Sequence, residues 1–173
     1  MYYSTKTRYA LRMMVDIAAN QKHGKVKIRD MSARQDISQK YLEQIITLLN
    51  KNDMVKGERG PQGGYVLTRP ASEITVAEVV DVMEGLAPVP CIKADGVDCE
   101  RKGVCTTIGM WERIDEAVRK IMSETTIQDL VDEAVAKGII RIGTSMPEYV
   151  IRCGRSEKGS WSGSAGRSLL AVV

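Results

Sequence analysis

The sequence predicts a mainly α-helical protein that carries one short β-hairpin. Apolar residues recur every three or four positions along much of the 173-residue chain, which is the spacing of helices with one buried face. Phe is absent and aromatic residues make up only 5%, so Leu, Ile, Val, Met and Ala must fill the core, which favours helix packing. Residues 55–67 differ, because the sequence VKGERGPQGGYVL is typical of a strand, a tight glycine turn and a second strand.

The first predicted helix begins after Ser4 or Thr5, either of which can cap it. Its apolar residues fall on one face, and Gly24 ends the segment. The residues expected to be buried on this face are Ala10, Leu11, Met14, Val15, Ile17 and Ala18.

Two further helices are predicted, at residues 28–35 and from Ser38 to the break at Asn52 and Asp53, with a turn at residues 36–37 between them. The inward residues are expected to be Ile28, Met31 and Ala33 in the shorter helix, and Leu42, Ile45, Ile46 and Leu49 in the longer one. The opposite face of the longer helix carries Lys40, Glu43, Gln44, Thr47 and Lys51, again at helical spacing.

The hairpin follows directly and has Arg59 at its tip. Its glycines, at positions 60, 63 and 64, allow turn conformations that a side chain would forbid, and Pro61 stiffens the tip. A short helix, a turn, a second helix and a hairpin together predict a winged helix-turn-helix with a two-stranded wing, spanning residues 1–84.

The second half of the chain is expected to hold the partner surface. A capping box at Thr75–Glu78 opens a helix that runs to Met83, and a cysteine-containing loop follows at residues 85–104. A long helix is predicted from about Cys105 to Ser123, and a short one after it, capped by Thr126, completes a unit at residues 105–135. Residues 136–173 are expected to form a flexible tail. The apolar stripe of the long helix is close to a coiled-coil seam, which predicts a homodimer; its members are Ile108, Trp111, Ile114, Val118 and Ile121.

Charge is distributed unevenly along the chain. Residues 1–70 hold thirteen Lys and Arg against six Asp and Glu, whereas residues 71–137 hold seven against fourteen. A basic first half suits a surface that faces DNA phosphates, although segregation by chance on a solvated surface remains the alternative. One histidine, no nucleophile elbow and no phosphate-binding glycine loop argue against an enzyme. The chain has no apolar run of 18 residues and no signal core, so no membrane contact is expected. The expected location is the cytoplasm, and the nucleoid when the protein is bound to DNA.

The exposed stripe of the third helix is the predicted reader of base edges in the major groove of double-stranded DNA. Gln can pair with adenine and Glu can accept from cytosine, while an arginine at a wing tip suits a narrow minor groove. The alternative is that these side chains only form a face exposed to solvent. The predicted DNA-contact residues are Thr5, Lys6, Ser38, Gln39, Lys40, Tyr41, Glu43, Gln44, Arg59 and Gln62.

Three cysteines lie close together in the loop: Cys91, Cys99 and Cys105, spaced C-x7-C-x5-C. Three thiolates within fifteen residues can converge on one metal centre, and iron–sulfur clusters favour thiolate ligands. Structural zinc, thiol redox sensing and inert cysteines are the alternatives. Cys105 is expected at a helix N-terminus, which stabilises a thiolate, whereas Cys153 in the tail is expected to be a free thiol.

Residues 5–11 (TKTRYAL), 37–44 (ISQKYLEQ) and 59–65 (RGPQGGY) resemble the Rrf-type winged-helix regulators, in the branch that includes iron–sulfur cluster regulators and nitric-oxide sensors. The resemblance covers roughly residues 1–135. It implies a homodimeric bacterial transcription factor, expected to be a repressor, on a palindromic or near-palindromic operator. It also implies an iron–sulfur cluster on the three loop cysteines that senses iron–sulfur status, redox state or nitric oxide. The expected type is [2Fe–2S], with [4Fe–4S], as in the nitric-oxide sensors, as the alternative.

The chain departs from that family pattern at the fourth ligand. Where cluster regulators place a histidine, this chain has Ile108, and where nitric-oxide sensors place an acidic residue on the first helix, it has Arg8. The fourth ligand is therefore unknown, and a cluster short of one strong ligand is expected to be lost easily from isolated protein. The nearest oxygen donors are Asp95, Asp98 and Glu100, and the only histidine is His23. A regulator without a cluster, using thiols, a small effector or a partner enzyme, and an interaction module without DNA affinity remain as alternatives.

Overall fold

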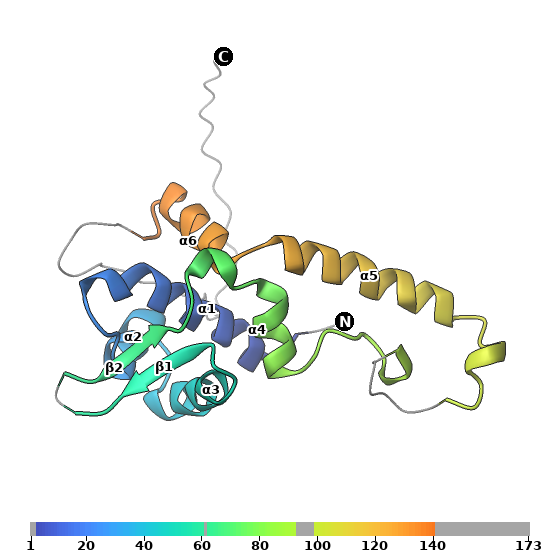
Figure 1. Ribbon diagram of the computed structural model, residues 1–173, viewed down its shortest axis with the longest axis horizontal. Coiled ribbons are helices and arrows are strands. Elements are labelled where there is room, and N and C mark those ends of the chain that lie inside the picture. Colours follow the sequence, from blue (N-terminus) through green and yellow to red (C-terminus); the bar gives the residue numbers. More distant parts are fainter. Residues whose placement is uncertain (1–2, 61, 93–98, 141–173) are drawn as a thin grey trace, which may run out of the picture.

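The computed structural model describes residues 3–60, 62–92 and 99–140. It is mainly helical with one two-stranded antiparallel sheet, as predicted. Figure 1 shows a body, formed by residues 3–84 and 125–140, from which one long helix projects. The helices are α1 (Thr5–Asn20), α2 (Ile28–Gln35), α3 (Gln39–Lys51), α4 (Val76–Met83), α5 (Ile108–Glu124) and α6 (Ile127–Ala136), and the strands are β1 (Val55–Glu58) and β2 (Gly64–Leu67).

Helix α1 lies at the centre of the body and contacts α3, α4, α6 and β2. It begins where Ser4 caps it, with the Ser4 Oγ accepting from the Thr7 amide at 3.2 Å, as predicted. The predicted inner face is confirmed, except that Leu11 is only partly buried. Met13, which the sequence argument left out, is fully buried. The helix is therefore enclosed over more of its circumference than one amphipathic stripe would require.

The turn between α2 and α3 forms at Asp36, which takes the left-handed conformation with φ 52°. The predicted bounds of α2 are confirmed, but the prediction that Ala33 points inward is wrong, since its side chain is exposed. Gln35 is buried in its place because it donates from Nε2 to the Asp16 carboxylate, 2.9 Å away on α1. A polar contact, which no hydrophobic pattern records, thus sets the rotation of α2.

Asp16 is the centre of a buried polar network between α1 and α2, and only 1% of its surface is exposed. Its carboxylate accepts from Arg34 Nη2 at 2.6 Å and from Arg34 Nε at 3.1 Å. Asn20 donates to the same carboxylate at 3.2 Å. A buried carboxylate is tolerated only when it is paired and hydrogen-bonded. The network therefore fixes α2 against α1 in one orientation.

The wing pairs β1 with β2 in antiparallel register, Val55 opposite Leu67 and Glu58 opposite Gly64. Tyr65 also exchanges two backbone hydrogen bonds with Val26, at 2.8 and 2.9 Å, which ties the wing to the segment before α2. Gly63 is required at the tip, since a Cβ there would lie 2.4 Å from the Glu58 carbonyl oxygen. Pro61, which was expected to stiffen the tip, lies outside the described residues.

Helices α4 and α6 close the body beside α1. Both predicted capping boxes are present, Thr75 with Glu78 on α4 and Thr126 with Asp129 on α6. A short antiparallel bridge between Thr75 and Thr126 places the starts of the two helices side by side. Ile140 folds back into the core with 4% of its surface exposed. Residues 141–173, including Cys153 and most of the expected tail, lie outside the described residues.

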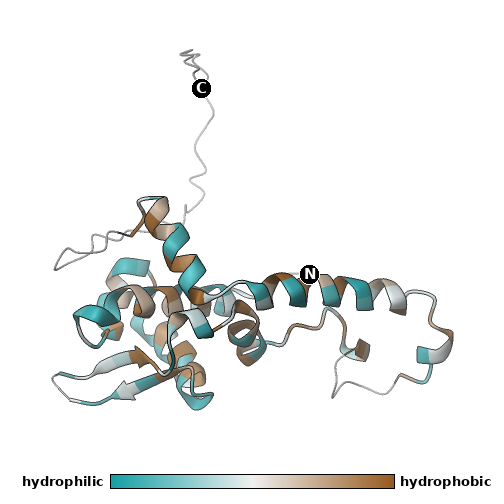
Figure 2. Ribbon diagram, turned by 45° about the horizontal axis from the view of Figure 1, so that its top comes forward, coloured by the Kyte–Doolittle hydropathy of each residue, from teal (hydrophilic) through white to brown (hydrophobic). Residues whose placement is uncertain are grey.

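Helix α5 projects from the body and carries both hydrophilic and hydrophobic residues along its length (Figure 2). It begins at Ile108, three residues later than predicted, because Cys105 is extended (φ −76°, ψ 111°) after a 3-10 turn at Lys102–Val104. No residue of α5 is buried. Among the described residues, no helix is long and apolar enough to cross a membrane.

Candidate nucleic-acid interface

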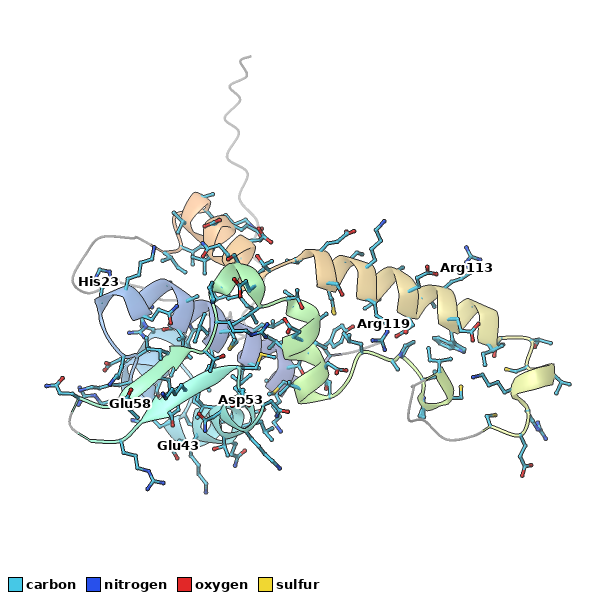
Figure 3. All side chains as sticks on the ribbon, viewed as in Figure 1. His23, Glu43, Asp53, Glu58, Arg113 and Arg119 are labelled. Atoms are coloured by element: carbon cyan, nitrogen blue, oxygen red, sulfur yellow. The ribbon has the colours of Figure 1, made fainter. Side chains whose placement is uncertain are left out.

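Helix α3 divides into a buried face and an exposed face. Leu42, Ile45, Ile46 and Leu49 are buried, as predicted, and hold the helix on the body. The opposite face is exposed at each predicted position, namely Gln39, Lys40, Glu43, Gln44, Thr47 and Lys51. The residues that hold α3 on the body are therefore different from those of its polar stripe, whose side chains are available to base edges. Figure 3 shows Glu43 of α3 and Glu58 of β1 on the part of the body away from α5.

The start of α3 leaves polar groups available to an anion. Ser38 is the N-cap, but its side chain makes no capping hydrogen bond. Its carbonyl accepts from the amides of Tyr41 and Leu42, both at 3.1 Å, so the first turn is closed by the backbone. The exposed Ser38 hydroxyl and the first amides of the helix suit a phosphate oxygen.

Tyr41 is half-buried, unlike its neighbours on α3, because its ring packs edge-on against Tyr9 with centroids 5.8 Å apart. Arg12 lies over the Tyr9 ring, with its guanidinium carbon 5.4 Å from the ring centroid. Arg12 also donates to the side chain of Gln35 at 2.8 Å and to its carbonyl at 3.1 Å. Together these contacts connect α1, α2 and α3.

Sequence reasoning did not identify Tyr9 and Arg12 as positioning residues. The only available signal was one tyrosine on each of the first and third helices of a chain poor in aromatic residues. The contacts themselves depend on how the three helices cross, which local spacing does not specify.

The wing presents Arg59 and Gln62 to solvent, as the prediction requires. The acidic neighbour Glu58 turns aside to pair with Lys25, and this hydrogen bond and charge lower the pKa of the Glu58 carboxyl. Arg59 forms no ion pair within the part of the chain that the structure describes. The wing is also tied to α3, since the Gly57 amide donates to the Asn50 side chain at 3.2 Å. Its arginine is thus exposed on a base that is rigidly joined to α3.

A groove of about 390 Å³, which no pattern in the sequence indicates, separates the wing from the start of α2. Arg29 on its wall has 79% of its side chain exposed and makes only a loose 3.5 Å contact with Asp30. Cationic side chains around a shallow groove suit the backbone of a polyanion. The lining residues are Lys27, Ile28, Arg29, Gly60, Gly63, Gly64 and Tyr65.

Thr5 and Lys6 lie in the first turn of α1, at the edge of the body. Thr5 is exposed and its hydroxyl accepts from Arg8 Nη2 at 3.1 Å, whereas Lys6 is half-buried. Both remain candidates for phosphate contacts at a site separate from α3.

The three loop cysteines are free and half-exposed. Cys91 sits in a 3-10 turn at Pro90–Ile92, Cys99 precedes a turn closed by the Lys102 amide, and Cys105 precedes α5. Among the described residues, no three Cys, His, Asp or Glu side chains gather as a metal site, so the thiols as placed do not fit a cluster.

The candidates for a fourth ligand differ in where the structure places them. Asp95 and Asp98 lie outside the described residues, and Glu100 is exposed. His23 lies in a 3-10 turn after α1, at the end of the body opposite α5 (Figure 3). Within one chain, therefore, His23 is far from the outer end of α5, where the loop lies.

Cys105 differs from the other two cysteines in its surroundings. Its Sγ lies 3.4 Å from the Thr107 hydroxyl. Hydrogen bonds from that hydroxyl and from the amides of Thr107 and Ile108 lower the pKa of the Cys105 thiol. The predicted position of Cys105 beside the start of a helix is confirmed, although the cysteine lies before the helix and not within it.

Residues 3–133 match the protein family described as Rrf2, iron-dependent transcriptional regulator. Over 133 residues the chain is 38% identical to the transcriptional regulator IscR of Photorhabdus laumondii, covering 76% of this chain and 80% of that protein.

Two solved structures share the fold. The IscR structure from T. potens is 30% identical, with a TM-score of 0.64, over 82% of this chain and 93% of that one. The structure of CymR, the global cysteine regulator of B. subtilis, is 31% identical with a TM-score of 0.63, over 77% and 98%. With its winged helix-turn-helix fold, and with relatives that are transcriptional regulators and not enzymes, this chain belongs to the Rrf2 family of transcriptional regulators.

Proposed function

We propose that this protein is a homodimeric repressor that places α3 in the major groove and the wing in the adjacent minor groove of an operator. The observation that carries the proposal is the division of α3, whose apolar face is buried while Lys40, Glu43 and Gln44 are all exposed. Gln and Glu match adenine and cytosine edges, and the exposed Arg59 suits a narrow A·T-rich minor groove. The relatives, which are transcriptional regulators, support the same reading.

Apolar residues along α5 support the dimer in this proposal. The predicted apolar stripe is only partly covered by its own chain: Ile108, Trp111, Ile114 and Val118 are half-buried, on a helix that contacts α4 and the turn at 90–92, whereas Ile121 is exposed. A second row, at spacings of four, three and four, comprises Met110, Ile114, Ala117 and Ile121. Met110 is 49% exposed and Ile121 is 66% exposed. Spacing of this kind matches a coiled-coil seam, and the same row on a second copy would cover it.

We further propose that the loop with Cys91, Cys99 and Cys105 receives the signal, in the first instance through an iron–sulfur cluster. The donor set is three thiols close to one end of α5, and the similarity to IscR supports this form. Because the thiols do not converge as placed, the cluster type and fourth ligand are left open and no step is assigned to the cluster.

A second form of sensing has an observation of its own. Cys105 is exposed to solvent on one side and has a lowered thiol pKa, which are the properties of a reactive thiol. The similarity to CymR, of which an oxidized form has been solved from Staphylococcus aureus, favours this form. In that case the cysteines would act by oxidation or modification and would need no metal.

The DNA-binding proposal is tested by selecting operators from a random duplex pool and measuring affinities on the selected site. Substituting Lys40 and Gln44 together by Ala is expected to lower the affinity at least about a hundredfold, because two base or backbone contacts are lost. The matched control substitutes Gln128 on α6 and Lys137, the C-cap of that helix, by Ala and should bind as the wild type does. Equal losses in both double variants would refute the assignment of α3.

The sensing proposal is tested by preparing the protein without oxygen and measuring iron, sulfide and zinc. Iron and sulfide with visible absorption, lost in Cys99→Ser, would support the cluster. One zinc per chain without visible absorption would indicate a structural metal site. Metal-free protein whose operator affinity changes on thiol oxidation would support the second form.

A further inference from the structure

Glu84 occupies the junction between the body and the cysteine loop. It is the C-cap of α4, and its amide bonds to the Val80 carbonyl at 3.1 Å. Gly85 follows with φ 81°, a conformation that favours glycine, so the chain turns sharply as it enters the loop. Leu86 is then anchored, with only 4% of its surface exposed. The side chain of Glu84 points back to the body and not into the loop.

The Glu84 carboxylate holds the first turn of α1. The Ser4 amide donates to Oε1 at 3.0 Å and to Oε2 at 3.3 Å. Burial alone would raise the pKa of the Glu84 carboxyl, but hydrogen bonds from the Thr7 side chain and from Ser4 lower it below its ordinary value. The first turn of α1 contains no acidic residue of its own. Glu84, at the end of α4, therefore supplies the negative charge that stabilises the N-terminus of α1.

The segment before α1 is held from a second side by α5. Tyr3 packs in a small cluster with Val76, Ala77, Val80 and Leu86, and Met122 of α5 and Leu130 join its rim. The Tyr3 hydroxyl donates to the Met122 Sδ at 3.8 Å. The residue before the loop and the helix after the loop thus both contact residues 3–7, which include the predicted phosphate contacts Thr5 and Lys6.

We propose that Glu84 is a positioning residue, which couples the arrangement of the cysteine loop to DNA affinity through the first turn of α1. The inference rests on the proposed function, since it assumes that the loop receives the signal and that Thr5 and Lys6 contact the operator. The coupling needs two discrete arrangements. In one the carboxylate accepts from Ser4 and Thr7, and in the other a displaced loop withdraws it, leaving Thr5 and Lys6 on a frayed turn.

The test compares two loop states that do not depend on which group the cysteines bind. Full-length protein carrying Cys153→Ser is studied with its loop thiols free and after alkylation with iodoacetamide. Amide hydrogen exchange at Ser4 and Thr7 and the operator affinity are measured in both states. In this background alkylation is expected to speed exchange in the first turn and to weaken operator binding about tenfold, within the usual range of coupling between sites.

Glu84→Gln is expected to remove the response to alkylation. Both loop states should then show fast exchange in the first turn and the same, weaker affinity. Glu133→Gln, which also removes one carboxylate but on the exposed face of α6, should respond as the background does. Should Glu84→Gln fail to fold, Thr7→Val removes a hydrogen bond to the same carboxylate with little change of shape, and should reduce the response.

The inference is overturned if Glu84→Gln responds to alkylation as fully as the background, or if alkylation leaves α1 exchange unchanged in the background. Absence of operator binding in unmodified protein would refute the proposed function instead. The exchange measurement would still decide whether Glu84 links the loop to α1.

Discussion

The body and helix α5 differ in how far contacts within the chain bury their apolar side chains and provide partners for their buried polar groups. In the body, α1 has four fully buried apolar side chains, and the buried Asp16 carboxylate is met by Arg34, Gln35 and Asn20. Helix α5 has no buried residue. Among the described residues, the one buried side-chain oxygen without a hydrogen-bond partner is Oδ1 of Asp115, on α5. The core of the body is therefore complete within one chain, whereas α5 is the part of the molecule whose apolar side chains a partner would cover.

The largest effect is expected at the centre of the body. Asp16→Ala leaves the guanidinium of Arg34 without its carboxylate, and breaking a buried pair in this way costs about 3–5 kcal/mol. Glu133→Ala on α6 removes an exposed pair with Lys137 and should cost at most about 1 kcal/mol. Urea unfolding measures both values. Similar losses would show that the Asp16 network does not hold the body together.

The next largest effect is expected on α5. Ile114→Asp combined with Ile121→Asp places two charges in the proposed dimer seam. The dimer should dissociate in sedimentation, and operator affinity should fall by about a hundredfold or more because the second half-site loses its tethered partner. Unfolding of the body should change little. As a control, Val104→Asp alters an apolar residue that is 80% exposed but lies outside the seam, and it should leave the dimer intact.

Much of this contrast could be predicted from the sequence, because it depends on local patterns. Helical spacing identified the buried faces of α1 and α3, and Thr75 and Thr126 marked helix starts through their capping boxes. Interactions across elements could not be predicted. The inward turn of Gln35, the Glu84 contact with Ser4 and the stacking of Arg12 on Tyr9 all depend on helix crossings.

The candidate site was predicted to a similar degree. The exposed stripe of α3 and the exposed Arg59 were expected, since they follow from helix and hairpin geometry. The partial cover of the α5 stripe by its own chain was not, because it depends on which side of the helix α4 contacts. Convergence of the three cysteines was expected from their spacing, and the described residues do not show it.

A smaller effect is expected for one base contact on α3. Gln44→Ala should cost about 1–3 kcal/mol in discrimination at one position of the operator, because a bidentate contact to a base is removed. Affinities for operators mutated at each position measure the change. Thr47→Ala, further along the same exposed face, serves as the control. A uniform loss across all base substitutions would indicate that Gln44 contacts only the backbone.

The wing is expected to contribute less. Arg59→Ala should weaken binding by about 1 kcal/mol, chiefly on operators with A·T-rich flanks, where a narrow minor groove concentrates negative potential. Lys51→Ala, at the end of α3, provides a change of equal charge for comparison. Titration against operators that differ only in their flanks would refute the minor-groove placement if the loss were independent of flank sequence.

The smallest effect is expected at the edge of the body. Lys6→Ala should weaken binding evenly across operator sequences and reduce the slope of log affinity against log salt by about 1, the signature of one lost phosphate contact. Lys120→Ala on α5 should leave that slope unchanged. A salt series between low and physiological ionic strength measures both slopes.

The most direct measurement is the arrangement of the sequences that the wild-type protein selects from a random duplex pool. Two copies of one body joined through α5 predict inverted half-sites, with centres about one helical turn of DNA, or a small multiple of it, apart. A lone half-site, direct repeats or a pool that shows no enrichment would contradict the account.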